Sequence, residues 1–230
     1  MDLNNGAEGG PLGATVSTAN SGGASGNPFD LFAGTPTITY DNTHALGTQS
    51  YKVVAGASAQ QMAWSSASVG TVAEMWWRIY LWSSAAPSGV TGIIRWTIGG
   101  SQAARLRYET DGTLTLSDSG NAAEIATASA FPTGEWARIE GHIQFVATGA
   151  AVELRTYHGD SATPIEAVTG SAGGIGVNCD QISFGSFNAA TWTGWMDGIN
   201  ANDNGFKGPL TRGRSGLLVP NYAARRAASW

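Results

Sequence analysis

Residues 71–82 alternate between apolar and polar side chains, and this run constrains the fold more than any other feature of the chain. The odd positions from 73 onward are all apolar: Ala73, Met75, Trp77, Ile79 and Leu81. The even positions mix aromatic and charged residues: Glu74, Trp76, Arg78, Tyr80 and Trp82. Because successive side chains of a strand point to opposite faces, this pattern predicts a strand with one face in a core and the other outside it.

Short runs of β-forming residues separated by turn clusters continue along the chain, which is typical of a sandwich or barrel. The 32 glycines of the 230 residues indicate many tight turns, and no segment has the apolar period of a helix of ordinary length. We therefore predict an all-β protein. The expected strands lie near 37–40, 49–55, 61–66, 71–82, 91–98, 104–110, 113–118, 136–147, 150–158, 180–187 and 191–199.

Two hairpins stand out among these strands. Asp111 and Gly112 separate two alternating runs, and this dipeptide favours a type I′ turn, in which both central residues have a positive φ. The second hairpin joins 136–146 to 152–157 through a short loop that contains Gly149.

Strand 136–146 and its hairpin partner repeat the separation into an apolar and a polar face. If these strands share a sheet with 71–82 and with the run that carries Arg105, Arg107 and Glu109, one face holds many charged and aromatic groups. Aromatic rings pack on sugar rings and charged groups bind hydroxyls, so we predict a lectin-like face there. Its expected ligand-binding residues are Trp76, Arg78, Tyr80, Trp82, Arg138, Glu140, His142 and Arg155. The alternative is that these charges form cross-strand ion pairs that keep an exposed sheet soluble.

The stretch from Gly134 to Gly141, the stretch Ile182–Gly185 and the stretch from Gly194 to Ile199 resemble motifs of concanavalin A-like jelly rolls, in particular laminin-G-like domains. The resemblance extends over roughly residues 37–204. It implies a two-sheet antiparallel jelly-roll sandwich, in a fold used mostly for glycan or protein binding. The glycine-rich start and the strand at 75–80 are similar to modules of actinobacteria and their phages.

Enzymatic chemistry has less support in the sequence. The Glu-x-Asp-x-x-Glu pattern of jelly-roll glycoside hydrolases is absent, and Glu135 and Glu140 are five positions apart, on opposite faces of a strand. A polysaccharide lyase acting on an acidic glycan is the better enzymatic alternative, because such a reaction needs a base, an acid and a cation. The residues with that chemistry are His142, Tyr157, Arg138 and Arg155.

No cofactor is expected. The single Cys179 cannot form an intrachain disulfide, and it has no cluster of zinc ligands around it. A calcium ion is the remaining candidate, with Asp197 and Asp203 as its oxygen ligands near an Asn-rich turn. Turn chemistry explains such a segment equally well.

Charge is distributed unevenly between the body of the chain and its end. The net charge is −5, which argues against nucleic acid as a partner. Residues 204–230 nevertheless contain five basic residues and no acidic one. We expect Arg212, Arg214, Arg225 and Arg226 to form a docking tail, with a solvated charge cluster as the alternative. The expected organisation is an N-terminal arm over 1–28, a sandwich over 29–204 and a basic tail over 205–230.

These observations together predict a non-catalytic structural or adhesion protein of a virion, on a phage tail or as a capsid decoration. We expect its partners to be other virion proteins, further copies of itself and a cell-surface glycan. The first residues lack the charged and apolar regions of a signal peptide, and no run of about 18 apolar residues predicts insertion into a membrane. We therefore expect synthesis in the host cytoplasm and a place on the virion surface. A bacterial carbohydrate-binding module is a further alternative.

Overall fold

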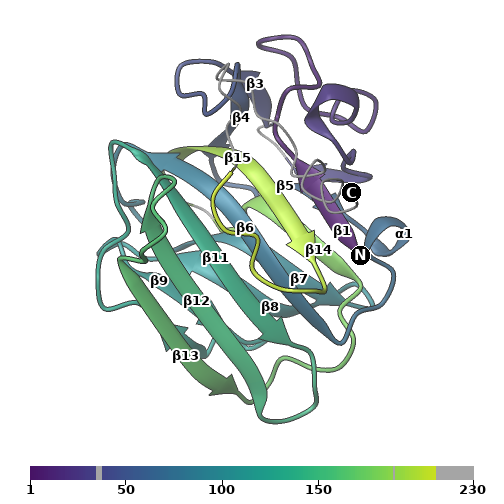
Figure 1. The fold of residues 1–230 in the computed structure, drawn as a ribbon, viewed down its shortest axis with the longest axis vertical. Coiled ribbons are helices and arrows are strands. Elements are labelled where there is room, and N and C mark those ends of the chain that lie inside the picture. The colour runs from purple at the N-terminus through teal and green to yellow at the C-terminus, as the bar shows by residue number, and fades with distance from the viewer. Residues whose placement is uncertain (35–37, 189, 211–230) are drawn as a thin grey trace, which may run out of the picture.

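A computed structural model describes residues 1–34, 38–188 and 190–210. The chain forms two antiparallel sheets packed face to face, which confirms the predicted all-β sandwich (Figure 1). The first sheet, sheet A, has eight strands. Seven of them follow the order β13 (Glu166–Ala172), β12 (Ala150–His158), β11 (Trp136–Gln144), β6 (Glu74–Ser83), β15 (Trp192–Asn202), β4 (Ser50–Ala55) and β3 (Thr39–Asp41). The eighth strand, β1 (Asp2–Asn5), pairs with β15.

The second sheet, sheet B, has seven strands. In order they are β10 (Ala123–Ala126), β9 (Leu114–Ser117), β8 (Ser101–Tyr108), β7 (Thr91–Ile98), β14 (Gln181–Ser186), β5 (Gln60–Trp64) and β2 (Leu31–Gly34). Helical structure in the described residues is limited to one turn of α-helix, α1 (Ser66–Val69), and the 3₁₀ turn Gly23–Ser25. None of the described helices is long and apolar enough to cross a membrane.

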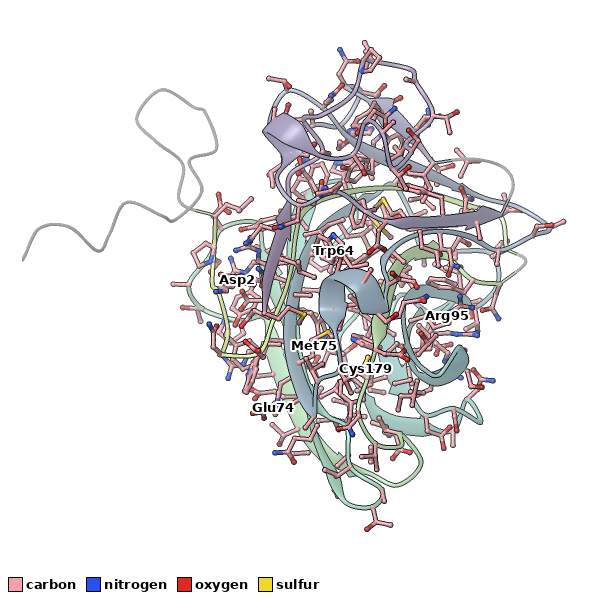
Figure 2. The ribbon with its side chains drawn as sticks, turned by 90° about the vertical axis from the view of Figure 1, so that its right-hand side faces the viewer. Asp2, Trp64, Glu74, Met75, Arg95 and Cys179 are labelled. Atoms are coloured by element: carbon pink, nitrogen blue, oxygen red, sulfur yellow. The ribbon has the colours of Figure 1, made fainter. Side chains whose placement is uncertain are left out.

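The core lies between the sheets and contains four of the five apolar residues predicted for one face of this strand, whereas Ala73 precedes β6 and is exposed. Met75, Trp77, Ile79 and Leu81 are each at most 2% exposed. Met75 lies between the two layers when the sandwich is seen from its side (Figure 2). Trp77 packs against Trp96 of sheet B with ring centroids 5.4 Å apart, and such aromatic pairs contribute to stability beyond the area they bury.

Four strands were not predicted: β1, β2, β10 and β13. Strands β2, β10 and β13 end their sheets, and β1 pairs only with β15. Sheet ends bury fewer side chains, so the apolar alternation that identifies a half-buried strand is weaker there.

The Asp-Gly hairpin is confirmed, but its turn type differs from the prediction. Strands β8 and β9 pair as expected. Gly112 has φ +89°, whereas Asp111 does not have the positive φ that a type I′ turn requires. The Glu109 carbonyl accepts from the Gly112 N–H, and the Asp111 carboxylate accepts from the Thr113 N–H at 2.9 Å. The aspartate therefore stabilises a three-residue loop with glycine in the left-handed position.

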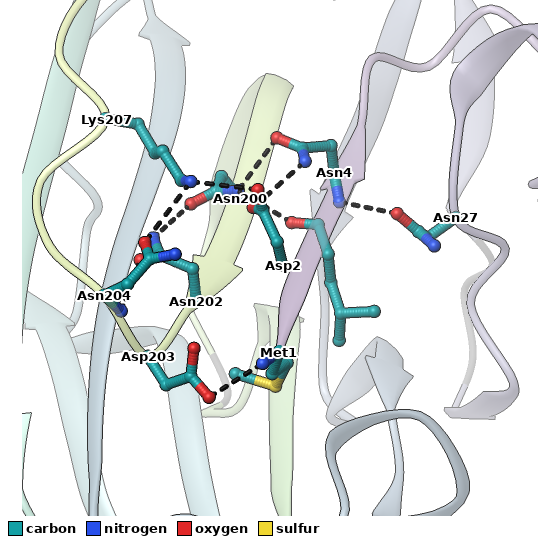
Figure 3. A network of polar contacts seen from close by, with 10 residues as sticks. Met1, Asp2, Asn4, Asn27, Asn200, Asn202, Asp203, Asn204 and Lys207 are labelled. Atoms are coloured by element: carbon teal, nitrogen blue, oxygen red, sulfur yellow. Dashed lines mark hydrogen bonds and ion pairs between the residues drawn. The ribbon is translucent and has the colours of Figure 1, made fainter. Parts of the chain in front are cut away.

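Residues 2–5 and 203–210, near the two ends of the described chain, pack on sheet A. Figure 3 shows the polar contacts that hold them. The Asn200 side-chain amide donates to Asp2 Oδ1 at 3.0 Å and to Asn4 Oδ1 at 2.8 Å. Lys207 binds Asp2 Oδ2 at 2.9 Å, and the N-terminal ammonium binds Asp203 Oδ2 at 2.7 Å. These contacts fix the first residues of the expected arm and the first residues of the expected tail to the sandwich.

Asp197 on β15 is completely buried, and burial raises the pKa of its carboxyl well above the usual range against the hydrogen bond from the Gly198 N–H. A raised pKa in the folded state means that this group stabilises the fold at low pH. Its contribution is lost as pH rises from the ordinary carboxyl pKa through the raised one.

We predict that Asp197→Asn gains stability relative to the wild type as pH rises from 4.5 to 7.5. Each unit of pKa difference is worth about 1.4 kcal/mol, so the relative gain should be at least about that size. Urea unfolding of both proteins at the two pH values measures it. Asp203→Asn, at a carboxylate that is 40% exposed, is the control and should show no such gain. Parallel pH dependence of Asp197→Asn and wild type would contradict the prediction.

Candidate functional site

The outward face of sheet A, which we call the polar face, carries the charged and aromatic residues predicted from the alternation. Strand register places Trp76 opposite His142, Arg78 opposite Glu140 and Tyr80 opposite Arg138. Strand β12 continues the rows with Glu153 opposite His142, Arg155 opposite Glu140 and Tyr157 opposite Arg138. All eight expected ligand-binding residues therefore share this face.

The Arg105 strand does not belong to this face. Strand β8 lies in sheet B, so Arg105, Arg107 and Glu109 are on the opposite layer of the sandwich. Alternation predicts the face of its own strand on which a side chain lies, but it contains no information about which strands pair.

The centre of the polar face is covered by the chain itself. Residues 203–210, the covering segment, cross the face after β15 (Figure 1). The Gly208 carbonyl accepts from Arg78, and the Leu210 N–H donates to the Tyr80 hydroxyl, both at 2.9 Å. Arg78 is 6% exposed and Tyr80 is fully buried, and burial lowers the pKa of Arg78 and raises that of Tyr80.

Arg138 and Glu140 form a buried ion pair beside this covered centre. They are 1% and 2% exposed, and Arg138 Nε lies 3.5 Å from Glu140 Oε1. Arg138 also donates to the Gly159 and Ser161 carbonyls and stacks over Tyr157, with its guanidinium carbon 3.9 Å from the ring centre. These contacts give both charged residues a structural role in the folded protein.

A partly exposed group remains at one end of the polar face, and we call it the acidic–aromatic cluster. Its members are Glu74, Trp76, His142, Glu153, Arg155 and Phe206. The Trp76 and His142 rings stack at 4.2 Å with 17° between their planes. His142 Nε2 lies 3.2 Å from Glu74 Oε2, and the Arg155 Nε–H donates to Glu153 at 2.6 Å. Phe206 of the covering segment packs on Arg155 with 3.8 Å from the guanidinium carbon to the ring centre.

The cluster combines an aromatic surface with two carboxylates and one guanidinium. The side chains of Glu74 and Arg155 are 41% and 32% exposed. Carboxylates accept hydrogen bonds from hydroxyls, a guanidinium donates them, and the aromatic ring provides apolar contact. The group thus has the chemistry to bind a polyhydroxylated ligand.

The third predicted aromatic residue, Trp82, lies at the other end of β6 in a separate arrangement. His44, in the loop between β3 and β4, stacks on Trp82 with ring centroids 3.4 Å apart. Trp195 meets both rings edge-on and donates its indole N–H to Asp41 at 2.9 Å. One face of Trp82 is therefore occupied by the protein's own imidazole.

The residues of the lyase alternative are not brought together around one point. His142 lies opposite Glu153, whereas Tyr157 lies opposite Arg138, so the rows that contain His142 and Tyr157 are four residues apart along the strands. Four residues of a strand span about 13 Å. Tyr157 is 4% exposed and lies under Arg138. A base and an acid must both reach the same sugar ring, and this arrangement does not provide that.

The two aspartates named for calcium have different surroundings. Asp197 is buried and accepts from Gly198, whereas Asp203 is paired with the N-terminal ammonium. Among the described residues, no three His, Cys, Asp or Glu side chains are grouped as a metal site would need. Cys179 is buried, which raises the pKa of its thiol to about 12.

The four arginines predicted to form a docking tail lie outside the described residues: Arg212, Arg214, Arg225 and Arg226. Phe206 and His44 belong to segments without strand periodicity, so no local pattern marks them as neighbours of β12 and β6. Glu74 belongs to the polar positions of 71–82, and Glu153 takes the corresponding polar position on β12, but only the strand register and the contact of His142 with Glu74 show that both flank His142.

Comparisons with known proteins support the fold. Neither protein-family models nor curated proteins give a match to the sequence. Among solved structures, the receptor-binding domain of botulinum neurotoxin mosaic serotype C/D has a TM-score of 0.55 at 14% identity, over 91% of this chain and 48% of that one. The serotype D/C VPI 5993 binding domain also scores 0.55, at 10% identity over 86% and 47%. A structure of botulinum neurotoxin type C, whose cell entry is described as dependent on interaction with two ganglioside molecules, has a TM-score of 0.53 at 10% identity, over 85% of this chain and 48% of that one. The present chain therefore spans less than half of each of these chains.

We predict that Glu140→Gln destabilises the protein by about 3 kcal/mol, because removing one partner of a buried ion pair leaves the other charge uncompensated. Glu153→Gln is the matched control, since its pair with Arg155 is partly exposed and should be worth at most about 1 kcal/mol. Urea unfolding at pH 7 gives both values. Equal losses for the two variants would show that the central pair is not the buried structural pair described above.

Proposed function

We propose that this protein is a non-catalytic β-sandwich module that binds a glycan through the acidic–aromatic cluster. The observation that carries the proposal is the Trp76–His142 stack, flanked by the carboxylates of Glu74 and Glu153 on neighbouring strands. A sugar ring places an apolar face on an aromatic side chain while its hydroxyls bind the surrounding charged groups.

Rigid support strengthens this proposal. The cluster rests on three adjacent strands of one sheet, β6, β11 and β12, whose register is continuous from Trp76 to His142 to Glu153. Side chains held by strands and by neighbouring ion pairs lose little freedom when a ligand binds. The fold is similar to that of a botulinum neurotoxin type C structure, and the cell entry of that toxin is described as dependent on interaction with two ganglioside molecules.

The cluster differs from the covered centre in what it can offer a ligand. Arg78, Tyr80, Arg138 and Glu140 have their polar atoms engaged or enclosed by the chain, so we assign them to structure rather than to sugar contact. Of the eight residues expected to bind a ligand, Trp76, His142 and Arg155 belong to the proposed site. Trp82 lies six residues further along β6, beside His44 and Trp195, and is not part of the proposed site.

We predict that Trp76→Ala reduces glycan affinity at least about tenfold, because aromatic contact residues at the centre of a site contribute most of its binding energy. Trp82→Ala is the matched control, since it removes the same side chain from the other end of the same strand. Screening the wild type on a glycan array and measuring the best ligand by calorimetry gives both affinities. Retained binding by Trp76→Ala, or equal loss in both variants, would reject the cluster as the site.

We further propose that the module is a structural or adhesion protein of a virion, on a phage tail or as a capsid decoration. The support is the resemblance of its sequence to modules of actinobacteria and their phages. The single cysteine, Cys179, is free and buried, and a chain without an intrachain disulfide is compatible with assembly in a reducing cytoplasm. In this proposal the basic tail contacts other virion proteins, and further copies of the chain complete the assembly.

We predict that changing Arg212, Arg214, Arg225 and Arg226 together to Gln, in the full chain, lowers its incorporation into particles severalfold, because the change removes four positive charges from the proposed contact. Quantitative immunoblotting of purified virions measures incorporation, and immuno-electron microscopy locates the protein. Incorporation equal to the wild type would reject the docking tail. Labelling of bacterial cells alone, without particles, would favour a bacterial carbohydrate-binding module.

A further inference from the structure

The outer face of sheet B carries two arginines whose charges directly oppose each other. Arg95 on β7 and Arg105 on β8 are cross-strand partners. Figure 2 shows Arg95 on the side of the molecule away from Asp2 and Glu74, which belong to sheet A. Like charges placed opposite one another destabilise a sheet, so this arrangement needs an explanation.

The protein surrounds these two guanidinium groups with neutral amides. Arg95 donates to the Gln61 side-chain oxygen, and Arg105 donates to the side-chain oxygens of Gln102 and, at 2.7 Å, Asn188. Over residues 1–34, 38–188 and 190–210, neither arginine has a carboxylate within ion-pair distance.

Arg107, the next outward residue of β8, shows the difference. Its guanidinium forms an ion pair with Glu109 at 2.8 Å, which supplies the negative charge that Arg95 and Arg105 lack. Arg107 therefore offers a matched comparison on the same face of the same sheet.

Both unpaired arginines are held in place and partly removed from water. The Arg95 guanidinium packs over the Phe187 ring at 4.6 Å. The Arg105 side chain lies over Gly92, where a Cβ atom would come within 2.4 Å of Arg105 Cδ. The Nε atoms of both arginines are buried without a hydrogen-bond partner. Burial lowers the pKa of each, and for Arg105 the charges of Arg95 and Arg107 lower it further.

We propose that Arg95 and Arg105 form an oxyanion-binding site, which takes a carboxylate or sulfate group carried on a hydroxylated molecule such as an acidic saccharide. One anion between the two guanidiniums would remove their repulsion and accept charge-assisted hydrogen bonds from both. The amide groups of Gln61 and Asn188, which present oxygen to the arginines, keep their N–H donors for neighbouring hydroxyls. This site lies on the other sheet from the acidic–aromatic cluster and does not depend on glycan binding there.

Calorimetric titration of the full-length protein at constant ionic strength, with glucuronate, sodium sulfate and neutral glucose as separate probes, tests the proposal. We expect saturable binding of an anion and none of glucose. Arg95→Gln and Arg105→Gln should each weaken anion binding at least about tenfold, because each removes charged hydrogen bonds to the ligand. Arg107→Gln makes the same charge change and should retain the wild-type affinity within about twofold.

NMR of the arginine Nε–H groups in the wild-type protein provides a readout that does not depend on any variant folding. Signals of Arg95 and Arg105 should shift and saturate with the anion, and that of Arg107 should not. Tighter binding of glucuronate than of sulfate identifies a sugar-borne acid as the ligand, whereas equal binding identifies the oxyanion alone. Absence of saturable binding to both anions, or an equal loss in Arg107→Gln, overturns the proposal.

Discussion

The contact between Trp77 and Trp96 across the two sheets is the interaction on which the rest of the structure depends. Gly141 on the neighbouring strand makes room for it, since a Cβ there would lie 2.3 Å from the Trp77 ring. This packing fixes which side of β6 faces the core. Because a shift of one residue in register would exchange the two faces of the strand, the same contact directs Trp76, Arg78, Tyr80 and Trp82 away from the core.

Charge on the polar face is managed by pairing and by coverage. Glu140 lies between Arg138, with which it pairs, and Arg78, which stands opposite it across the strands. Backbone carbonyls from the covering segment and from the loop after β12 accept from the terminal nitrogens of Arg78 and Arg138. Removing one member of a buried ion pair leaves the other charge uncompensated, so this centre is a structural feature. Ligand chemistry is thereby confined to the edge of the covered area.

Arg95 and Arg105 on sheet B lack the ion pairs that other outward arginines of the described chain form, Arg107 of the same sheet included. On sheet A, Arg138 pairs with Glu140 and Arg155 pairs with Glu153, in each case two positions away on the same strand. On sheet B, Arg95 and Arg105 have amides instead. An ion pair within the chain neutralises a guanidinium before a ligand arrives, whereas an amide leaves its charge available to an external anion. Sheet B thus presents two adjacent guanidinium groups that no carboxylate of the described residues neutralises.

Period-two alternation determined the fold class, the core face of β6 and β11 and the set of residues on the polar face, because strand geometry links each side-chain direction to its position in the chain. Only the tertiary structure decided which strands are neighbours, and it placed Arg105 on the other sheet from Arg138. It also decided what covers a face: residues 203–210 bury Arg78 and Tyr80 and bring Phe206 to Arg155. Coverage depends on the path of segments that have no period, and a local pattern therefore contains no information about it.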